Sequence, residues 1–443
     1  MTHDPQNVTV LRGRVLTFLE QPQGHDDAAS YRYIEDGAVV IGPDGKIIMI
    51  GEFKPEAAAH HTVIDHRPHL ILPGLIDPHI HFPQMQVIAS YAGSLLEWLN
   101  TYTFVEEQKF ADAAHAERIA GLFFDELIRH GTTTAAAYCS VHPQSVDAFF
   151  EESAALGTRM IAGKVMMDRN APGALTDTPK KGYDETKALI GTWHGKGRHL
   201  YCVTPRFAPT SSPEQMEMAG AVWNEHPGTY LQSHVAENRG EVAWARALYP
   251  ERKGYLDIYD HFGQLGKRAI YGHGIWLTED ELRRCHDTGT AIAHCPTSNF
   301  FLGSGCFNLR NAKKAGRPVR IGLGTDLGAG TSFSMLQTLN EAYKAAQLNG
   351  NPLSSGHAFY LATRGSAHSL YLEDTIGSIA PGMEADLVVL DLKSTPIIEY
   401  RMGYCNDLDD ALFIQMTLGD DRAVLATYVA GQLAYTRPAR HDA

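Results

Sequence analysis

The stretch Leu72-Pro-Gly-Leu-Ile-Asp-Pro-His-Ile-His-Phe82 joins the end of an apolar run to two histidines. The run from Leu70 to Ile76 has the composition of a fully buried strand. His79 and His81 follow it, and residues two apart on a strand point to the same side. Two imidazoles placed together at a strand end make half of a typical zinc site. A His-x-His pair alone is more often two unrelated polar residues, so this interpretation depends on partners elsewhere in the chain.

Length, composition and charge favour a soluble enzyme that acts on a small molecule. The chain has 443 residues, 44% of them hydrophobic and 20% charged, which is ordinary for a protein with a large core. Its net charge of -13 argues against a nucleic-acid partner, because such a surface needs a basic stripe. A membrane-spanning helix needs ~18 consecutive apolar residues, and no stretch approaches that length.

The cysteines and the first residues suggest a compartment. Six cysteines are scattered without a C-x-x-C pair, and Met1–Gln6 lack the basic and apolar regions of a secretory signal. A reducing cytoplasm is therefore expected. The missing Pro-Cys-x-x-Cys motif also excludes the small zinc deaminases that use it.

Strand-like runs lie at both ends of the chain, at residues 8–18, in a hairpin over 37–51, and at 384–391 and 422–436. So few short strands cannot bury a core alone. We therefore predict that residues 1–69 and 380–443 pair into one small β domain.

Between these ends, strand-like and helical segments alternate. The strand-like runs are 70–76, 131–138, 159–167, 200–207, 229–234, 269–273, 290–294 and 320–325. Ser212-Pro213 and Thr278-Glu-Asp-Glu281 are good helix starts within the helical segments between them. Alternation of this kind predicts a (β/α)8 TIM barrel over residues 70–379. A doubly wound open sheet is the alternative, but it usually carries a Gly-rich loop after its first strand, and none is present.

Polar residues cluster at the expected carboxyl ends of the strands, where a barrel forms its active site. They are His79, His81, Arg206, His234, Glu237, His273, His294, Thr297, Ser298, Asn299, Thr325 and Asp326, and the aromatic Phe207 follows Arg206. A catalytic zinc site takes imidazole and carboxylate ligands and leaves a position for water. The set His79, His81, His234 and Asp326 supplies such ligands.

The remaining roles follow from charge and position. Asp326 can contact the metal and accept the proton of the bound water. Glu237, three residues after His234, is suited to carry that proton to the substrate. His273 is placed to hydrogen-bond the hydroxide or a developing oxyanion. His294 is better explained as a buried structural histidine.

Lys164 bears on how many metal ions the site holds, and the ligand atoms bear on which metal it is. Some two-metal barrels bridge their ions with a carboxylated lysine, and Lys164 lies on the third expected strand. It has methionine neighbours, however, and the fourth strand ends in Thr204-Pro-Arg206 without a lysine. We therefore expect one ion per chain, zinc by preference, although nitrogen and oxygen ligands also suit iron.

The chain resembles the amidohydrolase superfamily. Pro73-Gly-Leu-Ile-Asp-Pro-His-Ile-His81 resembles its signature, and the later His-x-x-Glu, lone His and Thr-Asp look like its mononuclear deaminase branch. More narrowly, it is similar to the guanine deaminases over nearly its whole length. The stretches that carry this likeness are 79–84, 95–100 with 103–104, 131–134, 142–146, 163–170, 204–212, 295–299 and 325–326.

The resemblance implies hydrolysis of guanine to xanthine and ammonia in purine metabolism, by a metal-bound hydroxide that attacks C2 while Glu237 protonates N3. It implies that Gln84, Arg206 and the main chain of Phe207 read the purine edge, with His234, Glu237 and Asp326 also in contact with the substrate. It further suggests a homodimer. An arginine donor matches the O6 acceptor of guanine, and an aromatic side chain such as Phe207 or Trp98 can cover the ring. Trp98 is equally suited to helix packing.

Two other functions stay open. The same scaffold suits a deaminase of another ring, such as cytosine, a triazine or 8-oxoguanine, and the residues that separate these are Gln84 and Arg206. A barrel that has lost catalysis and serves as a binding subunit is less favoured, because the chain keeps every metal ligand. The long segment from Phe82 to Ala113 is a candidate lid over the pocket.

Overall fold

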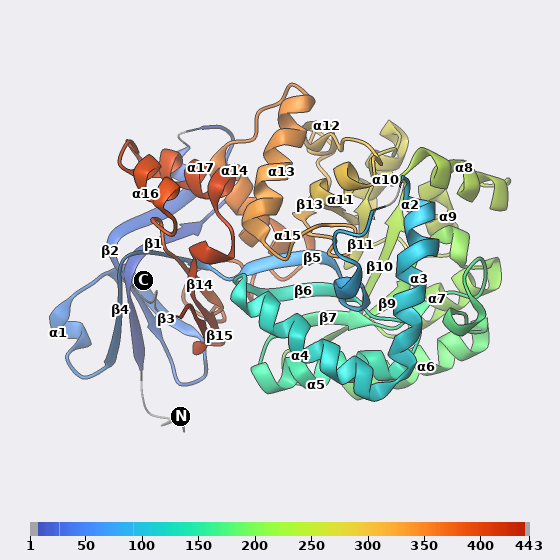
Figure 1. The fold of residues 1–443 in the computed structure, drawn as a ribbon, viewed down its shortest axis with the longest axis horizontal. Coiled ribbons are helices and arrows are strands. Elements are labelled where there is room, and N and C mark those ends of the chain that lie inside the picture. Colours follow the sequence, from blue (N-terminus) through green and yellow to red (C-terminus); the bar gives the residue numbers. More distant parts are fainter. Residues whose placement is uncertain (1–7, 26, 92, 439–443) are drawn as a thin grey trace.

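The chain forms a barrel with a second sheet beside it, built from both chain ends (Figure 1). The computed structural model describes residues 8–25, 27–91 and 93–438, so the outermost parts of the predicted terminal segments lie outside the described residues. Among the residues that are described, no helix is long and apolar enough to cross a membrane.

The terminal sheet has the strand order β16-β15-β14-β4-β1-β2-β3. Its members are β1 (Thr9–Phe18), β2 (Tyr31–Ile41), β3 (Ile47–Glu52), β4 (Thr62–Pro73), β14 (Leu387–Leu390), β15 (Val424–Val429) and β16 (Gln432–Thr436). The two chain ends meet where β4 pairs antiparallel with β14, with Leu72 opposite Val388. This confirms that both ends build one small β unit.

The prediction of one strand over residues 70–76 is wrong. β4 ends at Pro73 in the terminal sheet, and β5 (Leu75–His81) begins the barrel. Gly74 makes the change of sheet, and a Cβ atom there would lie 2.2 Å from Thr133 Oγ1. Residues on both sides of Gly74 are fully buried, so the apolar pattern continues through the change. The predicted boundary between residues 69 and 70 therefore falls inside β4.

The barrel strands pair in parallel in chain order from β5 to β13, which confirms the (β/α)8 prediction. They are β5, β6 (Thr132–Tyr138), β7 (Arg159–Gly163), β9 (Leu200–Pro205), β10 (Tyr230–Val235), β11 (Ala269–His273), β12 (Ala291–His294) and β13 (Arg320–Leu323), with the short β8 (Val165–Met166) pairing with β9. The last strand meets the first just beyond its own end, where Asp326 N donates to His79 O of β5 at 2.9 Å.

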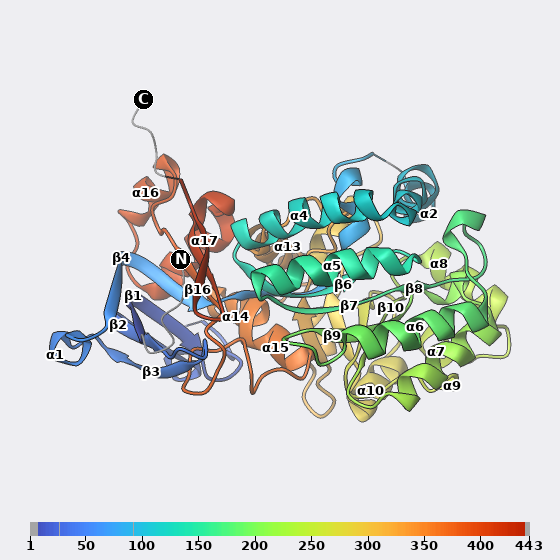
Figure 2. The same cartoon turned by 90° about the horizontal axis from the view of Figure 1, so that it is seen from below.

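Helices cover the outside of the barrel, and Figure 2 shows α4, α5, α6 and α7 lying along one side of it. The main helices are α4 (Ala113–Arg129), α5 (Pro143–Leu156), α6 (Pro179–Trp193), α7 (Pro213–Glu225), α8 (Arg239–Leu248), α9 (Tyr255–His261), α10 (Glu279–Thr288), α11 (Pro296–Phe301), α12 (Leu309–Ala312), α13 (Met335–Leu348), α14 (Ser355–Tyr360) and α15 (Ser366–Ser369). The predicted helix starts are confirmed: Ser212 caps α7 ahead of Pro213, and Thr278 forms a capping box with Glu281.

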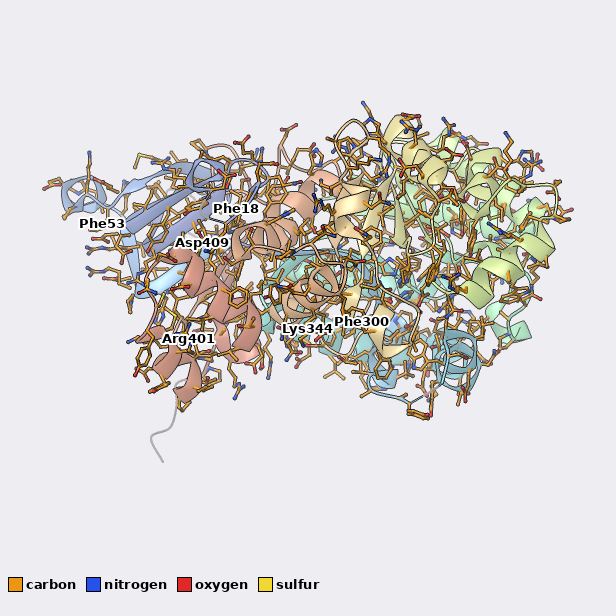
Figure 3. All side chains as sticks on the ribbon, turned by 90° about the horizontal axis from the view of Figure 1, so that it is seen from above. Phe18, Phe53, Phe300, Lys344, Arg401 and Asp409 are labelled. Atoms are coloured by element: carbon orange, nitrogen blue, oxygen red, sulfur yellow. The ribbon has the colours of Figure 1, made fainter. Side chains whose placement is uncertain are left out.

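The C-terminal segment also contains helices that the sequence did not predict, α16 (Pro396–Met402) and α17 (Leu408–Leu418). Figure 3 labels Arg401 and Asp409 on these helices and Lys344 on the neighbouring α13. Ser355 Oγ of α14 donates to Asp409 Oδ1 at 3.1 Å, and the rings of Tyr343 and Phe413 lie 5.1 Å apart. These contacts attach the C-terminal segment to the barrel.

A cluster of charges joins the barrel to the terminal sheet at the other end of the strands. Arg159 Nε, at the start of β7, donates to Glu384 Oε2 at 2.8 Å. Arg198 Nε donates to the same oxygen at 3.0 Å, and Arg198 also pairs with Asp386. All four side chains are largely buried, so the cluster is a fixed contact between the two units.

Candidate active site

The four side chains expected to hold a metal lie together at the carboxyl ends of the barrel strands. One ligand atom from each of His79, His81, His234 and Asp326 lies within 4.8 Å of the others, and all four residues are buried or nearly so. His81 Nε2 is 3.1 Å from His234 Nε2 and 3.2 Å from Asp326 Oδ1. His79 Nε2 is 3.4 Å from the same carboxylate oxygen.

Asp77 fixes the strand end that carries His79. Its Oδ1 accepts from the amides of His79 and Thr325, each at 3.1 Å, and its Oδ2 accepts from the Thr325 hydroxyl. Burial raises the pKa of Asp77 to about 7, although these hydrogen bonds oppose the rise. Asp77 thus ties the first barrel strand to Thr325, the residue before Asp326.

Close packing and backbone strain position the ligands further. A Cβ atom on Gly272 would lie 2.4 Å from the His79 ring, so β11 must carry glycine there. His273 and Asp326 have left-handed backbone conformations, with φ of 70° and 50°. Such conformations cost about 1 to 3 kcal/mol each for residues other than glycine and cluster at functional sites.

The protonation of the cluster suits a divalent cation. His234 Nδ1 donates to Arg206 O at 2.7 Å, which leaves Nε2 free to bind a metal. Burial lowers the pKa of His81 to about 4 and that of His234 well below its ordinary value. Burial alone would raise the pKa of Asp326, but the close imidazoles of His79 and His81 outweigh it and the pKa is lowered. Neutral imidazoles with one carboxylate are the donor set that zinc takes.

His79 Nε2 supports this fit, because it is a buried polar atom without a hydrogen-bond partner among the described residues. An unsatisfied buried nitrogen costs free energy, which a bound ion would remove. The residues present therefore fit a metal ion.

Glu237 lies beside this cluster without belonging to it. Its Oε1 accepts from Ser304 Oγ at 2.9 Å, and its Oε2 is 3.5 Å from His273 Nε2. Its amide donates to Glu241 Oε2 at 2.8 Å, which fixes the start of α8. Burial, and then the charge of Asp326, raise the pKa of Glu237 to about 8. A carboxyl group with a pKa near neutrality is suited to both accept and donate a proton.

His273 is oriented by a side-chain amide. Its Nδ1 is 2.8 Å from Asn299 Oδ1, and because an amide oxygen only accepts, Nδ1 carries the proton. Nε2 then lies between Glu237 and Asp326, 3.7 Å from Asp326 Oδ2. His273 therefore lies beside the ligand cluster, and its contact with a hydroxide or oxyanion stays a prediction.

A pocket opens above the ligand cluster. Its lining residues are His81, Gln84, Leu95, Trp98, Leu99, Arg206, Phe207, His234, Glu237, His273, Leu302, Asp326 and Ala329. The predicted substrate residues Gln84, Arg206 and Phe207 are thus in one pocket with the predicted ligands and Glu237. The segment from Phe82 to Ala113 is largely helical rather than a loop, and it contributes part of this wall.

Two residues considered in the sequence lie elsewhere. Lys164 is buried against Asp177, and its Nζ is 3.3 Å from Glu185 Oε2, so it is not part of the ligand cluster. His294 is buried beside the Phe307 ring, and burial lowers its pKa to about 3. Neither residue lines the pocket, which agrees with the structural interpretation of His294.

Three residues that the sequence analysis did not assign contact the pocket residues. Ser304 bonds Glu237 and Asn299 bonds His273. Glu107, on α3 (Phe104–Glu107), accepts from both Arg206 and Gln84. Asn299 follows a barrel strand, so its position was a signal, whereas Glu107 and Ser304 lie in segments without a pattern that would single them out.

Residues 70–434 match the model of the amidohydrolase family. The chain belongs to this family.

Relatives of this amidohydrolase cover nearly its full length. It is 50% identical to the guanine deaminase of Escherichia coli over 413 residues, which is 93% of each chain. Among solved structures, the guanine deaminase of Bradyrhizobium japonicum has a TM-score of 0.95 at 35% identity, covering 98% of this chain and 100% of that one. The guanine deaminase of C. acetobutylicum, solved with guanine in its active site, has a TM-score of 0.86 at 29% identity, covering 97% and 100%.

Proposed function

We propose that this amidohydrolase deaminates guanine to xanthine and ammonia by hydrolysis. The observation that carries the proposal is that one pocket holds Arg206 and Gln84 together with the metal-ligand cluster and Glu237. An arginine and a side-chain amide are the groups that a purine edge requires, and the cluster and the carboxyl group are those that a hydrolytic deamination requires. The relatives named as guanine deaminases support the same reaction.

Zinc, held by His79, His81, His234 and Asp326, is the proposed ion, one per chain. A metal ion in such a site lowers the pKa of a water molecule towards ~7 and so provides a nucleophile at neutral pH. Asp326 is the residue placed to receive the proton of that water. Protonated Glu237 gives its proton to N3 of guanine, which makes C2 more electrophilic, and the water oxygen adds to C2. Glu237, now ionised, takes the proton of the new C2 hydroxyl and passes it to the amino group, which leaves as ammonia while the C2–O bond becomes the carbonyl of xanthine. The proton held by Asp326 then returns Glu237 to its protonated form.

Recognition of the ring is proposed to use the polar and the aromatic walls of the pocket. Arg206 donates to the O6 acceptor, Gln84 contacts the neighbouring ring nitrogen, and the main chain of Phe207 contributes a further contact. The side chains of Trp98 and Phe207 lie in the pocket wall and cover the ring faces. His273 stabilises negative charge that develops during the addition.

We further propose that the protein is a cytoplasmic homodimer whose catalytic unit is the barrel. All six cysteines are free thiols, as expected in a reducing compartment. Ile397, Tyr400 and Tyr404 form an exposed apolar group on and after α16, with 59%, 63% and 62% of their surface accessible. An exposed group of this kind is a reasonable subunit contact. Light scattering on the wild type and on a Tyr400→Asp variant tests it, and a wild-type monomer would contradict the dimer.

The first experiment measures ammonia release by metal-loaded protein with guanine, cytosine, adenine and 8-oxoguanine. Turnover of guanine in preference to the others is expected. Activity on another ring would keep the metal chemistry but overturn the assignment of Gln84 and Arg206 to guanine. Loss of all activity on every ring with one metal bound per chain would contradict the proposed substrate.

Arg206→Ala tests recognition directly. It is expected to raise KM for guanine strongly, because a charged hydrogen bond to the substrate is lost. Unchanged kinetics on guanine would remove Arg206 from the substrate site.

A further inference from the structure

Glu107 lies behind the pocket and contacts both residues that read the substrate. Its two carboxylate oxygens accept from Arg206 Nη1 at 2.8 and 2.7 Å, and Oε1 also accepts from Gln84 Nε2 at 3.0 Å. All three residues are at most 3% exposed. Glu107 is not among the residues that line the pocket, so it acts through its neighbours.

This contact determines which end of the Gln84 amide faces the pocket. Arg206 can only donate, and it donates to both oxygens of Glu107, so Glu107 is an acceptor in this network. Gln84 must therefore turn its NH2 group towards Glu107 and its carbonyl oxygen away from it. Within the described residues, Gln84 Oε1 has no hydrogen-bond donor, and it faces Gly328 in the loop after Asp326.

The same contact occupies one end of the Arg206 guanidinium and leaves the other end free to bind a substrate. Nη1 is bound to Glu107, whereas Nε and Nη2 donate to no acceptor in the described part of the chain. The Phe104 ring, on the same helix as Glu107, lies 5.5 Å from the guanidinium carbon and limits its movement. The pocket thus offers an acceptor on Gln84 and donors on Arg206.

We propose that Glu107 is a positioning residue that makes this pocket selective for a lactam edge, a ring carbonyl next to a ring N–H. This rests on the proposed function and extends it. In guanine, O6 accepts from Arg206 and N1–H donates to Gln84 Oε1. An amidine edge such as that of adenine has the reverse pattern. The acceptor on Gln84 would then face a ring acceptor, and the donors on Arg206 would face an amino donor. Mispaired buried polar groups of this sort weaken the binding of a ligand strongly.

The Glu107→Gln variant tests the proposal because it is nearly isosteric. A glutamine at this position has one acceptor oxygen, whereas Glu107 uses Oε1 for both Gln84 and Arg206 and Oε2 for Arg206 alone. With the oxygen at the Oε1 place, the new NH2 group opposes Arg206 Nη1 and displaces the guanidinium. With the oxygen at the Oε2 place, the NH2 group opposes Gln84, which turns and presents its own NH2 group to the pocket. Either arrangement breaks the match to the lactam edge.

The measurement compares two unreactive ligands that differ only at this edge, hypoxanthine, which has the lactam, and unsubstituted purine, which lacks it. Calorimetry on metal-loaded protein gives a Kd for each. Wild type is expected to bind hypoxanthine at least ~10-fold more tightly than purine, a scale set by matched against unmatched buried hydrogen bonds. In the Glu107→Gln variant this ratio is expected to fall at least ~5-fold, and KM for guanine to rise more than kcat falls.

Glu106→Gln is the matched control, because Glu106 lies on the same helix but pairs with Lys109 outside the pocket. Its ligand ratio is expected to equal that of wild type. A role of Glu107 in folding alone would weaken both ligands equally and leave the ratio unchanged, and that result would overturn the proposal.

If Glu107→Gln does not fold, the ratio is measured on Gln84→Leu, which removes the acceptor and leaves the Glu107–Arg206 pair intact. An unchanged ratio there would also overturn the proposal. Guanine turnover by wild type is measured in parallel. Its absence would contradict the proposed function, whereas the binding ratio reports on Glu107 separately.

Discussion

Glu237 Oε2 lies 3.5 Å from His273 Nε2, so the ends of two neighbouring barrel strands place their side chains against each other beside the ligand cluster. Ser304 holds the other Glu237 oxygen from the opposite side. The carboxyl group is thus oriented by the protein itself, and its position does not depend on coordination to a metal. This separation of the proton carrier from the ligands makes the two functions testable one at a time.

Glu237→Gln removes the proton carrier and keeps the side-chain shape. We expect the variant to bind metal as wild type does and to turn over guanine at least ~100-fold more slowly, the usual scale for losing a general acid–base group. Metal analysis and steady-state kinetics measure the two properties. Turnover close to wild type would disprove the role of Glu237.

Ser304→Ala tests the hydrogen bond that orients Glu237. This hydrogen bond lowers the pKa of Glu237, which burial raises to about 8, so its loss moves the pKa further up. Because Glu237 must be protonated to give its proton to N3, the basic limb of kcat is expected to shift to higher pH in the variant. Ser332→Ala, outside the pocket, is the control, and an unshifted basic limb would argue against the contact.

Removal of the metal is expected to destabilise the protein as well as inactivate it. An ion that binds only the folded state stabilises it by about 2.7 kcal/mol at a concentration of ~100 times its Kd. Chelation should therefore lower Tm, and zinc should restore both Tm and activity. The Asp326→Ala variant should show a Tm that does not respond to the chelator. A metal-free protein with the Tm and activity of wild type would contradict the assignment of the ligands.

Glu384→Gln tests the charge cluster between the barrel and the terminal sheet. Burial raises the pKa of Glu384, but hydrogen bonds and charge from Arg159 and Arg198 outweigh this, so the pKa lies below its ordinary value of 4.5. The folded state is therefore stabilised above pH 4.5, and this contribution disappears as pH falls through the lowered pKa. We expect the variant to lose about 3 kcal/mol at neutral pH, with a smaller difference in acid.

Denaturant unfolding of wild type and Glu384→Gln across pH measures this difference. Glu399→Gln is the control, since Glu399 is exposed and lies 3.9 Å from Lys393, a contact of little energetic value. A difference between wild type and Glu384→Gln that stays constant down to acid pH would exclude the ionised carboxylate as its source.

The sequence was sufficient to predict the barrel and the ligand cluster because both depend on local order. Strands buried on both faces are continuous apolar runs, and parallel strands bring their carboxyl ends to one edge. His79, His81, His234 and Asp326 follow such runs directly. Their convergence is therefore a consequence of the fold class alone.

Glu107 and Gly74 were missed for different physical reasons. The role of Glu107 depends on its contact with Arg206, a residue far away in the chain. No periodicity in the segment around Glu107 indicates that contact. Gly74 separates two sheets, but the residues before and after it are equally buried, so hydrophobicity does not change there. A hydrophobic pattern predicts which residues are buried. It does not predict which distant residue a side chain contacts, or to which sheet a strand belongs.

β4 pairs with β1 on one side and, from Leu70 to Pro73, with β14 on the other. The ribosome makes β14 only after the whole barrel, so this edge of β4 has unpaired main-chain groups during most of translation. An open strand edge is a template for pairing with other chains. We therefore expect nascent chains to depend on chaperones until the last strands emerge. A chain truncated after residue 380 should aggregate even though every barrel strand is present.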